Sequence, residues 1–277
     1  MKQKVTVFGK GFLGTRISEK LGYNLIGQDE LDPANFSALK EYINSENPDV
    51  IINAAVKIGK PNADWCEANH GITLESNVLV PANFERICRE KGIYFVHMSS
   101  GCIYNGDNNG KGFLESDRPN NYGVSFHLTT KIMAEKMLEN FPCLIVRLKM
   151  PVDVKPHPRN LITKLAGYNK VIDEQNSITI VPDLISTMEK LINKKAIGTY
   201  NVFNPGTISA AEIMTMYTEI VDPNHSFTKI PLDELQTKVR RANSYLNTDK
   251  LISEGIYLPE IHEATRECLR EYKNNIK

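Results

Sequence analysis

Hydrophobic and polar positions in the first half of the chain follow two alternating patterns. Short apolar runs without polar alternation are typical of strands buried on both faces, and apolar residues three or four positions apart are typical of helices that cover a sheet. The expected strands are Lys4–Phe8, Asn24–Ile26, Asp49–Ala55, Ile93–Met98 and Cys143–Leu148, and the expected helices are Phe12–Leu21, Leu39–Ile43, Asn77–Lys91 and Phe126–Leu138. Because parallel strands need crossover connections, this order predicts a parallel sheet with helices on both faces.

The second half of the chain is less regular. Its proline-rich segment Pro151–Asn160 is expected to be a loop. The expected elements are helices at Asn160–Tyr168, Leu184–Ile192 and Ala210–Ile220, strands at Thr179–Val181 and Gly198–Phe203, and two short helices between Leu232 and Lys277. We therefore predict an α/β protein, with a Rossmann-type doubly wound parallel sheet and a small C-terminal substrate-binding cap. Residues 1–150 and 171–205 are expected to form the nucleotide-binding domain, and residues 151–170 and 206–277 the cap.

The composition argues against a nucleic-acid-binding protein and against a membrane-spanning one. The 33 Lys and Arg residues balance 33 Asp and Glu residues, whereas nucleic-acid-binding proteins usually carry a basic excess. No apolar run approaches the roughly 18 residues that cross a membrane, and the N-terminal apolar stretch is too short for a signal peptide. The five cysteines are odd in number and lack metal-ligand spacing. We expect a soluble, cytoplasmic protein with reduced thiols and no metal site.

A glycine-rich loop, G-x-G-x-x-G, lies between the first expected strand and the first expected helix. It consists of Gly9, Lys10, Gly11, Phe12, Leu13 and Gly14. Glycines let the backbone approach a pyrophosphate, and the N–H groups at a helix start bind it, so the loop predicts a dinucleotide site. About 20 residues further on, Asp29 would accept from a ribose 2′-hydroxyl and favour NAD, whereas Lys10 would attract the 2′-phosphate of NADP. These residues alone leave the choice open.

Three polar residues indicate the chemistry of the site. Ser100 follows the expected strand Ile93–Met98, and ligands in open parallel sheets bind at the carboxyl ends of strands. His127 and Lys131 are four residues apart, hence on one helix face. This combination resembles the short-chain dehydrogenases/reductases, in which Lys131 would bind the nicotinamide ribose while Ser100 and His127 would hydrogen-bond a carbonyl oxygen. A solvated His–Lys pair, and a Cys102 that only fills the core, are the structural alternatives.

The segment Gly59–Val78 resembles the substrate loop and following helix of the bifunctional 3,5-epimerase/4-reductases of UDP-rhamnose synthesis. The similarity continues through SGCIY (100–104), GFLESDRPN (112–120), SFHLTTKIMAE (125–135), RLKMPV (147–152), PRNLITK (158–164), YNKV (168–171) and FNPGTIS (203–209). The more distant dTDP-4-dehydrorhamnose reductases share the fold and the reduction but lack the epimerising cysteine and lysine. The resemblance implies an NADPH-dependent enzyme that converts UDP-4-keto-6-deoxy-D-glucose to UDP-L-rhamnose.

By this resemblance, Cys102 and Lys164 are the pair that epimerises C3 and C5. Both carbons flank the ketone, so their protons are acidified through an enolate. Inversion needs a base on one face of the sugar and an acid on the other, and a thiol and an amine on opposite walls would serve. Ser100 and His127 would stabilise the enolate oxygen and later the alkoxide. Which member of the pair removes the proton stays open.

The resemblance also implies binding residues and an assembly. Asn53, Ala54 and Ala55 would hold the adenosine side of the cofactor, and Met150 and Val152 would contact its nicotinamide, with NADPH preferred over NADH. The expected substrate-binding residues are Lys60, Asn62, Trp65, Asn77, Tyr104, Arg159, Asn160, Arg241 and Asn243, of which the arginines suit a diphosphate. The family also implies a homodimer.

The chain departs from the family at His127, which stands where the family has its active-site tyrosine. An imidazolium can donate a proton, but Lys131 would lower its pKa, and a fall of about one unit would slow reduction around thirtyfold. The glycine loop is also one residue shorter than the family's G-x-x-G-x-x-G. Two alternative hypotheses are reduction without epimerisation, and a regulatory NADP-binding subunit that has lost catalysis. Cys102 and Lys164 argue against the first, and the single altered catalytic position argues against the second.

Overall fold

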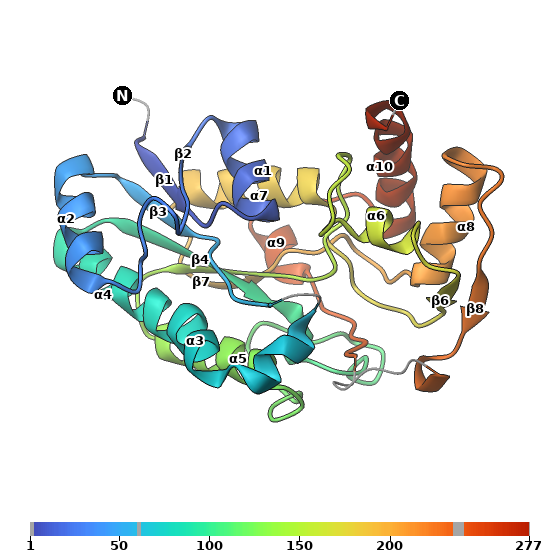
Figure 1. The fold of residues 1–277 in the computed structure, drawn as a ribbon, viewed down its shortest axis with the longest axis horizontal. Coiled ribbons are helices and arrows are strands. Elements are labelled where there is room, and N and C mark those ends of the chain that lie inside the picture. Colours follow the sequence, from blue (N-terminus) through green and yellow to red (C-terminus); the bar gives the residue numbers. More distant parts are fainter. Residues whose placement is uncertain (1–2, 60–61, 235–240, 277) are drawn as a thin grey trace. The chain divides into compact units, whose positions relative to one another are not determined.

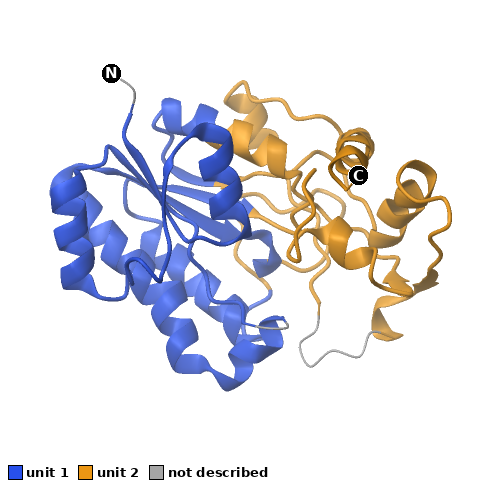
Figure 2. Ribbon diagram, turned by 45° about the horizontal axis from the view of Figure 1, so that its top comes forward, with its two compact units in different colours: residues 1–103, 121–147, 189–199 blue, residues 104–120, 148–188, 200–277 orange. Residues whose placement is uncertain are grey.

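A computed structural model describes residues 3–59, 62–234 and 241–276. The chain divides into two compact units (Figure 2). Unit 1 consists of residues 1–103, 121–147 and 189–199, and unit 2 of residues 104–120, 148–188 and 200–277.

Unit 1 is built on a six-stranded sheet with the order β2-β1-β3-β4-β5-β7. Its strands are β1 (Val5–Phe8), β2 (Asn24–Ile26), β3 (Val50–Asn53), β4 (Tyr94–Ser100), β5 (Leu144–Leu148) and β7 (Gly198–Asn201). Strand β1 pairs in parallel with both β2 and β3, and β3 pairs in parallel with β4. All residues of β1, β3 and β5 are buried, as expected of apolar runs without alternation. The predicted Rossmann-type α/β fold is confirmed.

Helices cover both faces of this sheet (Figure 1). They are α1 (Phe12–Leu21), α2 (Phe36–Glu46), α3 (His70–Leu74), α4 (Val80–Lys91) and α5 (Phe126–Leu138). One apolar core holds α2, α4 and α5 against the strands, with Phe8, Phe84 and Phe95 at its centre. Helix α1 lies on the other face. Helix α5 begins where Ser125 Oγ accepts a hydrogen bond from the backbone N–H of Leu128 at 3.2 Å, which fixes the register of the residues that follow.

Unit 2 contains a small parallel sheet of β6 (Lys170–Ile172) and β8 (Thr228–Ile230). Its helices are α6 (Leu161–Leu165), α8 (Ala210–Ile220), α9 (Asp249–Ser253) and α10 (Ile261–Asn275), and α7 (Val181–Asn193) runs from unit 2 into unit 1. Helices α8 and α10 pack together over a core that includes Ile213, Met214 and Leu269. The sequence did not reveal β6 and β8, because three residues are too few to show a period.

Several predicted boundaries differ from the observed ones, and two of them have a clear physical reason. The strand expected at Thr179–Val181 is only a single bridge between Ile180 and Val152, and Val181 is already the first residue of α7. The helix expected from Asn77 begins instead with a π-helical turn at Glu75–Leu79, and α4 starts at Val80. A short apolar run does not distinguish a strand from a buried helix start, and a π turn leaves no mark on the helical spacing.

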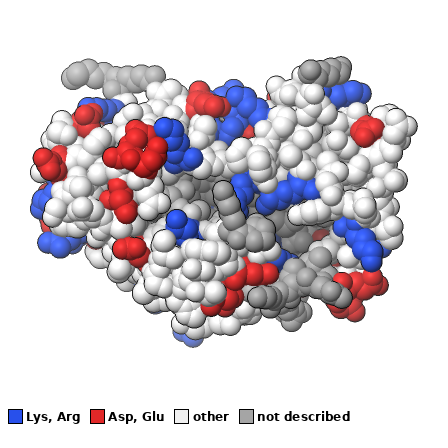
Figure 3. All heavy atoms as spheres, viewed as in Figure 1, with Lys and Arg blue, Asp and Glu red and all other residues white. Residues whose placement is uncertain are grey.

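Figure 3 shows basic and acidic side chains interspersed over the face drawn. All five cysteines are free thiols, and Cys102 is the one that is partly exposed. Among the described residues, no helix is both long enough and apolar enough to cross a membrane.

Candidate active site

The strand order of unit 1 places a switch point between β1 and β3. After β1 the chain goes to β2 on one side, and it then returns to pair β3 with the other side of β1. Gly9 N donates to Ile26 O at 2.9 Å, and Ala54 N donates to Phe8 O at 2.8 Å. The residues that follow β1 and β3 therefore adjoin at the carboxyl edge of the sheet, where Rossmann-type folds bind a dinucleotide.

The glycines of the loop have two different roles. Gly9 has a φ of +111°, and a Cβ on it would lie 2.5 Å from Ala55 N; a Cβ on Gly14 would lie 2.0 Å from Gly9 O. Both positions require glycine so that the loop, α1 and β3 can pack closely. Nothing lies within 4 Å of the Cβ position of Gly11, which precedes the first residue of α1. The exposed backbone at Gly11 thus fits the approach of a pyrophosphate.

The residues expected at the ribose lie together beside this loop. Lys10 Nζ forms an ion pair with Glu30 Oε1 at 2.9 Å, and the stem of Lys10 and Asp29 Oδ1 both lie against Gly27. The cation that would favour NADP and the carboxylate that would favour NAD are therefore both present. Because the ion pair is exposed, its contribution is small, and Lys10 can exchange Glu30 for a phosphate.

Asn53 connects the end of β3 to β4. Its Oδ1 accepts from Ala55 N at 3.1 Å, so its Nδ2 faces Nδ1 of His97 at 3.2 Å. His97 is 1% exposed, and burial, followed by the charge of Lys131, holds its pKa well below the ordinary value. Asn53 thus fixes the backbone at Ala54 and Ala55 that the cofactor is expected to contact.

Lys131 is 4% exposed on α5, and its Nζ donates to Met98 O on β4 at 3.1 Å. Burial lowers the pKa of Lys131 to about 8, while the charge of Glu135 acts in the opposite direction. The amine is therefore mostly protonated at neutral pH and can release a proton near pH 8.

Glu135, one helical turn after Lys131, belongs to a buried ion pair that the sequence analysis missed. Arg147 on β5 contacts both carboxylate oxygens of Glu135, with an Nη2–Oε2 distance of 2.7 Å, and Ser99 Oγ donates to the same carboxylate. A buried pair with its hydrogen bonds satisfied is stable only as a unit. The four-residue spacing from Lys131 to Glu135 was the available signal.

His127 lies one turn before Lys131 and is 9% exposed. Burial, followed by Lys131, lowers its pKa to about 4, against a smaller opposing effect of the Lys57 carbonyl. Only about one ring in a thousand is thus protonated at pH 7. The expected fall of about one pKa unit was too small, because burial affects His127 more than the neighbouring charge does. Asn77 Nδ2 lies 3.5 Å from Nδ1 of the ring, and Thr130 Oγ1 donates to the backbone carbonyl of His127. Of these two residues, only Asn77 was singled out from the sequence.

Ser100 and Cys102 lie in the turn that ends β4. The Ser100 Oγ accepts from Cys102 N at 3.2 Å, and the Cys102 carbonyl accepts from Asn121 Nδ2 at 2.9 Å. The turn is therefore held on both sides of the thiol.

The expected substrate loop is anchored to the start of α5. Asn62 Oδ1 accepts from Asp64 N at 2.8 Å and begins the 3₁₀ turn Ala63–Ala68. Within this turn, Trp65 is half-buried and lies against Gly59, where a Cβ would be 2.4 Å from the Cβ of Trp65. Glu67 Oε1 accepts from Phe126 N, the first residue of α5, at 2.7 Å. Lys60 lies outside the described residues.

Unit 2 holds the second group of predicted residues. Lys164 is half-buried on α6, and burial, followed by the charges of Arg159 and Arg241, lowers its pKa. Arg159 N also donates to Nδ1 of His157 at 3.0 Å. The structure thus brings Lys164 within electrostatic range of two expected ligands of the diphosphate, Arg159 and Arg241. Cys102 belongs to unit 1 and Lys164 to unit 2, so their pairing stays a prediction.

Two further candidates have their polar groups engaged internally. Asn160 is fully buried, and its Nδ2 donates to the carbonyls of Asp153 and Lys155, while its Oδ1 caps α6. Tyr104 is also fully buried, and its hydroxyl donates to the carbonyl of Asp117 at 2.7 Å. In this structure both residues support their loops.

The other predicted residues of unit 2 are Met150, Val152 and Asn243, and the first two pack in or against its apolar core. Met150 has a φ of +47°, which is unusual for a residue with a side chain, and it turns the chain just after β5. Val152 is buried, with its N–H donated to Thr179 O at 2.9 Å. Asn243 O accepts from Gly106 N at 2.7 Å.

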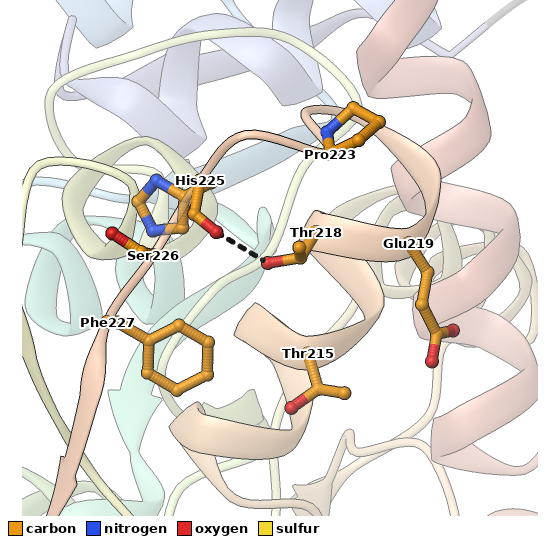
Figure 4. Close-up of a pocket in the computed structure, with 7 residues that line it drawn as sticks. All are labelled: Thr215, Thr218, Glu219, Pro223, His225, Ser226 and Phe227. Carbon is orange, nitrogen blue, oxygen red and sulfur yellow. Dashed lines mark hydrogen bonds between the residues drawn. The ribbon is translucent and has the colours of Figure 1, made fainter.

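A surface hollow of about 470 Å³ lies beside the end of α8 (Figure 4). The residues that line it are Thr215, Thr218, Glu219, Pro223, His225, Ser226 and Phe227, and Thr218 Oγ1 donates to His225 O at 3.5 Å. None of the predicted site residues lines this hollow.

The sheet, the open glycine loop and the buried His–Lys pair define a nucleotide-binding α/β protein of the Rossmann type. The chain belongs to the RmlD substrate binding domain family, whose model matches residues 3–274.

Sequence relatives include proteins named as rhamnose epimerase/reductases. A bifunctional dTDP-4-dehydrorhamnose 3,5-epimerase/dTDP-4-dehydrorhamnose reductase from Arabidopsis thaliana is 38% identical over 80% of this chain and 76% of its own length. A second relative from the same plant is the trifunctional UDP-glucose 4,6-dehydratase/UDP-4-keto-6-deoxy-D-glucose 3,5-epimerase/UDP-4-keto-L-rhamnose-reductase RHM2. It is 34% identical over 94% of this chain and 41% of its own length.

Solved structures share the fold over almost the whole chain. The L780 UDP-rhamnose synthase of Acanthamoeba polyphaga mimivirus superposes with a TM-score of 0.89 at 28% identity, covering 98% of this chain and 100% of the other. A dTDP-4-dehydrorhamnose reductase from Clostridium acetobutylicum superposes with a TM-score of 0.84 at 22% identity, covering 98% and 99% of the two chains.

Proposed function

We propose that this protein converts UDP-4-keto-6-deoxy-D-glucose to UDP-L-rhamnose, by 3,5-epimerisation followed by NADPH-dependent reduction of the C4 ketone. The observation that carries the proposal is the buried face of α5, where Lys131 and His127 lie one turn apart behind the carboxyl end of β4. The family and the names of the relatives in Arabidopsis thaliana and mimivirus support the same substrate class.

NADP(H) is the proposed cofactor. The close approach at Gly9 and Gly14, the open backbone at Gly11 and the cation of Lys10 fit a phosphorylated dinucleotide. A dTDP-4-dehydrorhamnose reductase from Bacillus anthracis with the same fold was solved in complex with NADP, at a TM-score of 0.82 and 21% identity. Bound NADPH supplies the hydride to C4.

In the reduction, this chain's residues manage the charge at O4. Ser100 and His127 are proposed to hydrogen-bond the ketone oxygen and then the alkoxide. Lys131, with a pKa of about 8, is the buried ammonium that can release a proton to the alkoxide.

In the epimerisation, Cys102 and Lys164 are proposed to exchange protons with C3 and C5 from opposite faces of the sugar. The lowered pKa of Lys164 supports this role, because a larger fraction of neutral amine is then present at neutral pH. The arginines beside Lys164 would bind the diphosphate of the same substrate.

A second candidate function is reduction alone, as in the dTDP-4-dehydrorhamnose reductases. Membership of the RmlD family and the superposition on such a reductase favour it. It differs from the main proposal in one respect, because it needs no proton transfer by Cys102 and Lys164.

Incubation of the purified protein with the 4-keto sugar nucleotide in deuterated water tests the proposal. We expect deuterium at C3 and C5 without added cofactor, and oxidation of NADPH with formation of UDP-rhamnose when it is added. Reduction without deuterium uptake would favour the second candidate. Neither exchange nor oxidation would support a regulatory protein without catalysis.

The variant Cys102→Ala isolates the epimerisation. It should abolish deuterium exchange while leaving the reduction of a pre-epimerised sugar largely intact. Cys88→Ala is the matched control, because Cys88 is a buried thiol of α4 whose pKa is raised by burial. Equal loss of exchange in the two variants would contradict a catalytic role for Cys102.

A further inference from the structure

The segment of unit 2 that precedes α6 forms a turn that begins at His157. The carbonyl of His157 accepts a hydrogen bond from Asn160 N at 2.9 Å, and Pro158 occupies the second position of the turn, which its fixed φ favours. The N–H of His157 donates to Thr163 Oγ1 on α6 at 3.3 Å. The turn therefore places Arg159, an expected ligand of the diphosphate, between His157 and α6.

The ring of His157 binds the backbone of Arg159 inside this turn. Arg159 N donates to Nδ1 of His157 at 3.0 Å, and a backbone N–H can only donate. Nδ1 must therefore be an acceptor, so the ring is neutral and carries its hydrogen on Nε2. Asparagine and aspartate side chains make the same bond to the N–H two residues further on. His157 thus makes with a ring nitrogen the bond that those residues make with an oxygen.

The surroundings of the ring favour its neutral form. His157 is half-buried. Burial, followed by the charge of Arg159, lowers the pKa of the ring, Asp153 opposes this effect, and Lys164 adds to it. Because the ordinary pKa of histidine is about 6.5, the lone pair on Nδ1 is available for Arg159 N at neutral pH.

We propose that His157 is a positioning residue for the sugar nucleotide, which holds Arg159 in place through the lone pair on Nδ1. The inference rests on the proposed function, since it takes Arg159 as a ligand of the substrate diphosphate. An arginine whose backbone is already fixed loses less conformational freedom on binding, so the turn should increase the affinity for the diphosphate. The competing arrangement is a His157 that contacts the substrate itself.

The hydrogen bond is observed directly by NMR of ¹⁵N-labelled protein. The chain has six histidines, and the ring signals of His157 are those absent from the spectrum of His157→Asn. We expect a coupling between the backbone nitrogen of Arg159 and Nδ1 of His157 at pH 7.5. This coupling should vanish when the ring takes up a proton in acid, because two donors then face each other. A hydrogen on Nδ1 at pH 7.5 would overturn the proposal, whatever the protein's activity.

Two substitutions of His157 separate positioning from direct contact. His157→Asn supplies an oxygen that accepts from the same N–H, so its affinity for the sugar nucleotide should stay within about twofold of that of the unmodified protein. His157→Phe keeps a ring but removes the acceptor, and it should bind about fivefold more weakly, the loss that one hydrogen bond implies. His262→Asn removes another half-buried histidine of unit 2 and is the control, with unchanged affinity.

Calorimetric titration with UDP-glucose and with dTDP-glucose at pH 7.5 measures these affinities without catalysis. Equal weakening in His157→Asn and His157→Phe would mean that the histidine contacts the substrate itself, and unchanged binding in His157→Phe would mean that the turn does not position Arg159. Either result would overturn the inference and leave the proposed function intact. If the unmodified protein bound neither nucleotide sugar, the proposed function would fail, and the inference with it.

Discussion

His127 and Lys131 in unit 1 and Lys164 in unit 2 all have lowered pKa values, but in different surroundings. In unit 1, His127 and Lys131 are almost fully buried, and the carboxylate of Glu135, which is itself paired with Arg147, opposes the effect of burial on Lys131. In unit 2, Lys164 is only half-buried, and the charges of Arg159 and Arg241 add to the effect of burial. Burial lowers the pKa of both Lys131 and Lys164, and two neighbouring arginines lower the pKa of Lys164 further.

This difference agrees with different roles for the two units in the proposed reaction. A buried site with satisfied hydrogen bonds suits stabilisation of charge on a single oxygen, because the low dielectric strengthens each hydrogen bond. A partly exposed group of cations suits an anion such as a diphosphate, whose negative charge would raise the pKa of Lys164 again on binding. Replacing Lys131 in unit 1 and Lys164 in unit 2 therefore provides the strongest test of the comparison.

The largest effect is expected for Lys131→Met. Removal of the buried ammonium should lower the rate of reduction by about a thousandfold, while deuterium exchange at C3 and C5 continues. Stopped-flow measurement of NADPH oxidation with a pre-epimerised sugar checks the first part, and mass spectrometry the second. Lys136→Met, an exposed position on the same helix, is the control and should change neither rate.

The reverse result is expected for Lys164→Met. Deuterium exchange should fall by several hundredfold, whereas the reduction of a pre-epimerised sugar should change by less than about tenfold. The exposed Lys170 on β6, replaced by Met, is the control for loss of positive charge in unit 2. Equal loss of exchange and reduction in Lys164→Met would mean that the two units do not divide the chemistry in this way.

Acid should destabilise unit 1 through its buried histidines. The pKa of His127 is about 4 in the folded protein and near 6.5 in the unfolded chain, so the unfolded chain binds more protons between these values. Stability is therefore complete above pH 6.5 and decreases as the pH falls towards 4, by about 3 kcal/mol from this residue. Urea unfolding of the protein and of His127→Phe at pH 7 and pH 4.5 measures the difference, which should shrink in the variant. His97 should leave a residual acid dependence in both proteins.

The smallest effect is expected for His127→Tyr. A phenol at this position can donate to O4 without an unfavourable charge, so the variant should retain the rate of reduction or raise it by up to about tenfold. Steady-state kinetics with NADPH and the pre-epimerised sugar provide the measurement. Complete loss of reduction would indicate that His127 has a role other than donating a hydrogen bond.

Helices with a clear hydrophobic periodicity were predictable from the sequence. The helices Phe12–Leu21, Phe126–Leu138 and Ala210–Ile220 have the predicted bounds, because each combines apolar spacing with a Gly or Ser at its start. The glycine loop was recognisable for a similar reason, since Gly9 and Gly14 meet backbone atoms that leave no room for a side chain. Local geometry forces these choices, and the sequence therefore records them.

The surroundings of the site were less predictable. Nothing near Lys57 in the sequence indicates that its backbone would orient Asn77, twenty residues further on. Arg147 likewise reaches Glu135 only because β5 lies beneath α5, and Asn160 is engaged by its own loop. Such contacts join segments that are distant in the chain, and no period or motif encodes them.

The sequence by itself determined the α/β order, the glycine loop and the candidate reactive side chains, since these depend on local periodicity and residue type. The tertiary structure decided the electrostatic state of those side chains. Burial of His127 and Lys131 beside β4, and the grouping of Lys164 with two arginines, depend on which surfaces pack together. The free energy of protonating a side chain depends on how deeply it is buried and on the charges within a few ångströms, and folding alone decides both for a given residue.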